Sequence, residues 1–175
     1  MPRMKEFLCN NGPWGQLVRL KNIDIQGLSN QRTTRLSPNY TITPIQVPHR
    51  DEYSETVGFK IAGPNKTALF IPDIDKWQLW TYPIDSMVNV VDYAFIDATF
   101  YSTQELPHRD IKDIPHPLVT ESIDLLNGMG AEQRKKVYFI HLNHTNPLLN
   151  PISKESIEVE KKGFHIARLD DVFAM

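Results

Sequence analysis

Residues 137–147, VYFIHLNHTNP, join an apolar run of four residues to two histidines and two asparagines. The run is short, rich in β-branched and aromatic residues and followed by polar ones, which indicates a buried strand. Two other runs have the same form: residues 67–71 (TALFI) lead into Asp73, and residues 92–96 (DYAFI) lead into Asp97. Because ligands of open α/β sheets collect at the carboxyl ends of strands, these polar residues predict a site.

The segments around these runs predict the fold class. Residues 41–47 and 57–61 are rich in β-branched residues and are expected to be further strands, whereas residues 120–129 and 153–162 are expected to be helices that stop near glycines. Strands that alternate with helices favour a layered α/β domain. No internal repeat or linker is visible, so we expect residues 1–175 to belong to a single domain.

Composition excludes several classes of function. Lys and Arg number 19 against 21 Asp and Glu, the net charge is −2 and no long basic cluster occurs, so nucleic-acid binding is not expected. No apolar segment approaches the roughly 20 residues of a membrane span. The single Cys9 rules out an internal disulfide and a cysteine-rich zinc site, and it fits a reducing compartment such as the cytoplasm.

The polar residues at the predicted strand ends have the chemistry of metal ligands. His49, Asp73, Asp97 and His141 combine neutral imidazole nitrogens with carboxylates, which suits zinc, manganese or iron. Taken singly, a strand-end aspartate is more often a turn former, and a loop histidine more often a hydrogen-bonding residue. The order of the whole set is what favours a shared site.

Five segments carry that order, each with one histidine or aspartate of interest: VPHRDEYSETVGFKI with His49, ALFIPDID with Asp73, FIDATF with Asp97, HPLVTE with His116, and YFIHLNHTNP with His141. In this order they resemble the second half of a metallo-β-lactamase-fold hydrolase. Within that superfamily, TVGFKI and HLNHTNPLL look most similar to the pyrroloquinoline quinone biosynthesis protein B-like family.

The resemblance implies an αββα sandwich and a role for each residue. His49 and His141 would bind metal, most often zinc, and Asp73 would bridge two ions. Asp97 and His116 would be catalytic, with Asp97 accepting a hydrogen bond from a histidine and His116 passing a proton to a leaving group. The activity implied is metal-dependent hydrolysis of a small molecule or peptide, or oxygen activation by iron in quinone cofactor biosynthesis.

One departure from the superfamily changes the expectation. The signature H-x-H-x-D-H, which supplies most metal ligands, occurs nowhere in the sequence. We therefore expect the carboxy-terminal portion of such a domain, inactive alone, with metal weakly bound or absent. A half-sandwich of this kind should form a homo-oligomer or bind a companion amino-terminal half. The alternative is a non-catalytic binding or assembly module that has lost the metal site.

Several residues keep two interpretations. His144 and Asn146 are candidates to support the metal ligands or contact substrate, or they belong to a turn before Pro147. Asp75 rivals Asp73 as a metal ligand, and His116 is equally consistent with a rigid Pro-His-Pro entry to a helix. The remaining assignments are structural: Trp77 and Trp80 as packing residues, and His108 and His165 as surface or strand residues.

Overall fold

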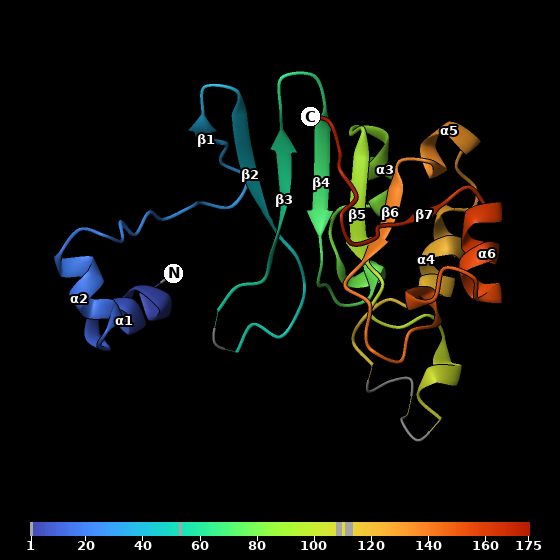
Figure 1. The fold of residues 1–175 in the computed structure, drawn as a ribbon, viewed down its shortest axis with the longest axis horizontal. Helices are drawn as coiled ribbons and strands as arrows, with labels where there is room; N and C mark the ends of the chain where they lie inside the picture. The colour runs from blue at the N-terminus through green and yellow to red at the C-terminus, as the bar shows by residue number, and fades with distance from the viewer. Residues whose placement is uncertain (1, 53, 108–109, 111–113) are drawn as a thin grey trace.

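The computed structural model describes residues 2–52, 54–107, 110 and 114–175, so His108 lies outside the described residues. These residues form one sheet of seven strands that follow chain order across the sheet (Figure 1). The strands are β1 (Thr34–Ser37), β2 (Tyr40–Gln46), β3 (Val57–Ala62), β4 (Thr67–Ile71), β5 (Tyr93–Asp97), β6 (Val137–Ile140) and β7 (His165–Ile166). Neighbours from β1 to β4 are antiparallel, and neighbours from β4 to β7 are parallel.

The helices fall into two groups (Figure 1). The hairpin of α1 (Pro2–Asn10) and α2 (Trp14–Arg19) lies apart from the other helices. The others, beside the parallel half of the sheet, are α3 (Ile84–Asn89), α4 (Val119–Leu126), α5 (Ala131–Arg134) and α6 (Lys154–Lys161). The short 3-10 helices are η1 (Trp77–Leu79), η2 (Thr103–Glu105) and η4 (Pro147–Leu149). Among the described residues, no helix has the length and apolar character needed to cross a membrane.

The core lies between the parallel strands and the helices α3, α4 and α6. Alternate strand residues such as Leu69, Ile96 and Phe139 are fully buried against helix residues that include Val88 and Val119. Burial on this scale stabilises the domain by about 25 cal/mol for each Å² of apolar surface removed from water. The predicted α/β layering is therefore confirmed, because each strand places alternate side chains toward one helical layer.

The opposite face of the sheet carries an aromatic row. Pairing registers align Phe59 with Phe70, Phe70 with Phe95 and Phe95 with Tyr138, and side chains in register share a face. Phe173 of the C-terminal tail makes T-shaped contacts with Phe95 and Tyr138 at centroid distances of 4.8 and 4.9 Å. Phe70 keeps 37% of its surface exposed. Helices of the described chain thus cover one face of the sheet, and a short tail covers part of the other.

The predicted strands and helices lie where expected, with small shifts at their ends. The helix predicted at 120–129 ends at Leu126, and the one predicted at 153–162 spans Lys154–Lys161 behind the cap Ser153. Trp77 and Trp80 are buried packing residues, as predicted; Trp77 begins the 3-10 helix η1 and Trp80 directly follows it. The elements without a prediction are short or partly exposed: α1, α2, β1, α3, α5 and β7.

Candidate metal centre

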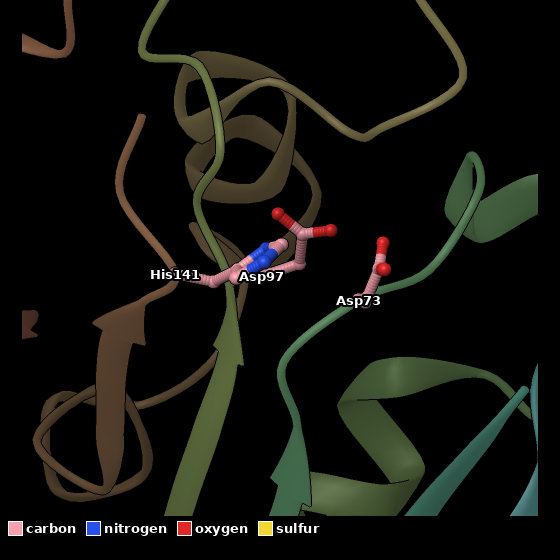
Figure 2. Close-up of side chains that lie close together, drawn as sticks. All are labelled: Asp73, Asp97 and His141. Carbon is pink, nitrogen blue, oxygen red and sulfur yellow. The ribbon is translucent and has the colours of Figure 1, made fainter. Parts of the chain in front are cut away.

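Five side chains singled out in the sequence meet at one edge of the sheet. Three follow neighbouring parallel strands: Asp73 lies two residues after β4, Asp97 ends β5, and His141 directly follows β6 (Figure 2). Parallel neighbours present their carboxyl ends at the same edge, which brings these residues together. An oxygen from each of the two aspartates and a nitrogen of His141 lie within 4.8 Å of one another.

Two loop histidines complete the cluster. His49 Nε2 lies 3.3 Å from Asp73 Oδ1, and His116 Nδ1 lies 3.4 Å from the same oxygen. The His116 ring centroid is 5.5 Å from that of His49 and 6.2 Å from that of His141. The loop between β2 and β3 supplies His49, and the segment before α4 supplies His116. All five candidates therefore share one cluster, although the role of each as ligand or catalyst stays a prediction.

Asp97 is fully buried and its carboxylate is saturated with hydrogen bonds. Oδ1 accepts from the backbone N–H and the hydroxyl of Thr99, both at 2.7 Å. Oδ2 accepts from the backbone N–H of Ile74 at 3.1 Å and pairs with His116 Nδ1 at 2.8 Å. Because four donors already occupy it, Asp97 is better placed to orient His116 and the strand-end loops than to bind a cation directly.

Thr99 joins the cluster although no motif in the sequence singled it out. Its hydroxyl oxygen lies 3.2 Å from His116 Nδ1 and 3.1 Å from His141 Nδ1, besides its bond to Asp97. A hydroxyl has one proton to donate, which goes to Asp97, so its lone pairs are free to accept from imidazole N–H groups. The only available signal was its place in FIDATF, two residues beyond the strand-end aspartate.

Three aspartate side chains lie close enough to His116 to affect its pKa. Burial is the largest influence and disfavours the charged ring, but the hydrogen bond to Asp97 and the charges of Asp97, Asp73 and Asp75 together outweigh it. The pKa of His116 is consequently raised above its ordinary value. A histidine with a raised pKa holds its proton more firmly near neutral pH, which suits an acid more than a base.

Asp75 faces away from the shared oxygen of the cluster and toward a histidine. Its Oδ1 lies 2.8 Å from His49 Nδ1, on the opposite side of the ring from Asp73. The sequence left Asp75 as a rival of Asp73 for the ligand role. Of these two aspartates, only Asp73 belongs to the group of potential ligand atoms that includes His141 among the described residues.

His144 and Asn146 differ from each other in their surroundings. The Asn146 side chain is 2% exposed, donates to the carbonyl of Ala98 at 2.7 Å and accepts from Leu148 N–H at 2.9 Å. It forms the predicted turn and ties two strand-end loops together. His144 is exposed on the same loop.

The donor set fits a divalent cation. Asp73 Oδ1 is buried and accepts no hydrogen bond from any described residue, although it lies close to two imidazoles. A buried carboxylate oxygen without a donor is costly unless a positive charge compensates it. Nitrogen and carboxylate ligands at such spacing are typical of zinc and similar ions.

Comparison with known proteins identifies the class. Residues 2–142 match the sequence model of the beta-lactamase superfamily domain, and the chain belongs to this family. The resemblance inferred from the five segments is thereby confirmed at the level of the family.

The curated relatives that the chain matches carry the same name, coenzyme PQQ synthesis protein B. Coenzyme PQQ synthesis protein B of Methylobacillus flagellatus is 26% identical over 136 residues, which cover 71% of this chain and 43% of that protein. The protein of the same name from Nitrosococcus oceani is 23% identical over 156 residues, 84% of this chain and 49% of that protein. The chain therefore spans about half the length, or less, of the curated relatives it matches.

Solved structures show the same fold. The Zn(2+)-bound PqqB from Methylobacterium extorquens superposes with a TM-score of 0.73 at 21% identity, covering 95% of this chain and 58% of that one. A metallo hydrolase from the archaeon Ignicoccus hospitalis gives a TM-score of 0.54 at 14% identity, covering 86% of this chain and 59% of that one. The metallo-β-lactamase-like fold is thus shared with both.

Proposed function

We propose that this chain forms one half of the active site of a metal-dependent hydrolase related to coenzyme PQQ synthesis protein B. The observation that carries the proposal is the buried Asp73 Oδ1, which has no donor among the described residues and lies between His49 and His116. His49, Asp73 and His141 would hold the cation, for which zinc is favoured and iron or manganese are alternatives. When bound, such an ion supplies Lewis acidity and lowers the pKa of water.

The other residues of the cluster would bind and move protons. Asp97 fixes His116 through Nδ1 at 2.8 Å, which leaves Nε2 as the atom that exchanges protons with a substrate. Because the pKa of His116 is raised, the ring is suited to protonate the leaving group of a small-molecule or peptide substrate. An oxygen-activating reaction of quinone cofactor biosynthesis is the alternative chemistry if iron is the ion.

A partner polypeptide would complete the site. The sequence has no H-x-H-x-D-H segment, and the chain spans about half the length of its curated relatives. We propose that a partner packs on the aromatic face around Phe70. The partner is either a polypeptide that carries the remaining ligands, namely the amino-terminal half of the sandwich, or a second copy of the chain. Alone, the chain would bind metal weakly and be inactive. The single cysteine fits action in the cytoplasm.

A zinc titration with paired histidine variants tests the site. His141 and His144 lie on the same loop three residues apart, and only His141 is among the clustered ligand atoms. Loss of a residue that is hydrogen-bonded to a metal ligand typically lowers metal affinity by roughly 10–100-fold. We expect His141→Ala to lower zinc affinity by more than this, and His144→Ala to bind zinc like the parent chain. Equal behaviour of the two variants would overturn the proposal.

The second candidate is a non-catalytic binding or assembly module. The specific observation in its favour is the aromatic row, in which Phe70 remains 37% exposed. A chain that binds no zinc either as a monomer or in its self-associated form would support the module and contradict the hydrolase. Substrate turnover by the chain together with its companion half would support the hydrolase.

A further inference from the structure

Asp75 is tied to the segment that carries His49 at two points. Its backbone N–H donates to the carbonyl of Pro48 at 2.8 Å, and its Oδ1 lies 2.8 Å from His49 Nδ1. The two side chains are mostly buried, at 22% and 15% exposure. The loop after β4 therefore holds both the position of the His49 backbone and one edge of its ring.

This contact decides which ring nitrogen of His49 carries the proton. A neutral imidazole has one N–H, and a carboxylate at hydrogen-bond distance from Nδ1 places the proton there. Nε2 then presents a lone pair, and it faces Asp73 Oδ1 at 3.3 Å. A lone pair opposite an anionic oxygen is unfavourable without a positive charge between them, so this arrangement is prepared for a cation.

The other two histidines of the cluster follow the same rule. His116 uses Nδ1 for Asp97 at 2.8 Å, and His141 uses Nδ1 for the Thr99 hydroxyl at 3.1 Å. In each ring, one nitrogen is engaged by a protein oxygen and the other remains for a ligand. Asp75 thus occupies the orienting position for His49 that Asp97 and Thr99 occupy for their partners, and its oxygen is already engaged.

We propose that Asp75 is a positioning residue that fixes His49 as the Nδ1–H tautomer, directs Nε2 to the cation, and does not itself bind the metal. The role at the cation rests on the metal site of the proposed function. The control of the tautomer does not, because it can be measured in the metal-free protein. Metal-binding histidines commonly donate their second N–H to a carboxylate, and removing that partner lowers metal affinity about 10–100-fold.

Nitrogen-15 NMR of the histidine rings at pH 8 in the metal-free protein tests the tautomer, with the His49 signal assigned by its loss in His49→Asn. We expect the proton on Nδ1 in the parent chain, a shift of population to Nε2–H in Asp75→Ala, and rescue in Asp75→Asn, whose amide oxygen still accepts. A proton on Nε2 or on both nitrogens in the parent chain, or an unchanged ring in Asp75→Ala, would overturn the proposal.

Zinc titration of the same variants separates positioning from ligation. We expect Asp75→Ala to lose roughly 10–100-fold in affinity and Asp75→Asn to remain near the parent value. A loss in Asp75→Asn as large as that in Asp73→Asn would make Asp75 a ligand and overturn the positioning role. A parent chain with the Nδ1–H tautomer but no zinc binding would overturn the proposed metal site while supporting the control of His49 by Asp75.

Discussion

His49 Nε2 lies 3.3 Å from an Asp73 carboxylate oxygen that is buried and accepts no hydrogen bond from the described residues. Both atoms carry lone pairs when His49 is neutral with its proton on Nδ1. The pair is therefore unfavourable as it stands and becomes favourable when a cation lies between the two.

The two aspartates after β4 should differ in their effect on zinc binding. Asp73→Asn removes the negative charge beside the unsatisfied oxygen and replaces one carboxylate oxygen by an NH₂ group. Asp75→Asn, in contrast, keeps an oxygen that accepts from His49 Nδ1. We expect the loss of zinc affinity in Asp73→Asn to exceed that in Asp75→Asn by about tenfold or more. Isothermal titration calorimetry of both variants checks this, and equal losses would show that both acids ligate.

Asp97 should contribute to the free energy of unfolding of the domain. Asp97→Asn places an amide N–H₂ among donors that include the backbone N–H groups of Ile74 and Thr99. Since a buried donor left without an acceptor costs about 1–3 kcal/mol, we expect the free energy of unfolding to fall by about 3 kcal/mol. Urea denaturation measures it, and the exposed Asp124→Asn should change stability by less than about 0.5 kcal/mol.

Thr99 should link stability to metal binding through its hydroxyl. Thr99→Val keeps the shape but removes the contacts to Asp97 and to His141 Nδ1. We expect a loss of about 1–2 kcal/mol in the free energy of unfolding, together with weaker zinc binding because the His141 ring loses its partner. Thr99→Ser retains the hydroxyl and should restore both. A valine variant with unchanged zinc affinity would exclude the orienting role of Thr99.

The aromatic face should drive association. Phe70 and Leu125 are similarly exposed, at 37% and 48%, but Phe70 lies on the aromatic row and Leu125 on α4 at the helical side. Because contiguous apolar surface favours association by about 25 cal/mol for each Å² buried, we expect light scattering at micromolar concentration to show oligomers of the parent chain.

Matched charged variants locate that interface. Phe70→Asp should shift the protein to the monomer, and Leu125→Asp should leave the oligomer intact. A parent chain that is a compact monomer with a cooperative melting transition would mean that the tail with Phe173 covers the aromatic face sufficiently.

The sequence by itself determined three buried strands and the candidate residues at their ends, and the structure showed that these strands are parallel. Short apolar runs followed by Asp73, Asp97 and His141 are local patterns, and local patterns can be read without knowledge of neighbours in space. The order of five segments also identified the superfamily, which the match over residues 2–142 confirms.

Only the tertiary structure decided how the candidates divide their roles. Asp73 and Asp75 are two residues apart and chemically identical, yet one faces the shared cluster and the other faces His49 Nδ1. Asp97 is saturated by donors from Ile74, Thr99 and His116, which come from three separate segments of the chain. Such distinctions depend on distance and direction between residues far apart in sequence, and composition and spacing along the chain do not encode them.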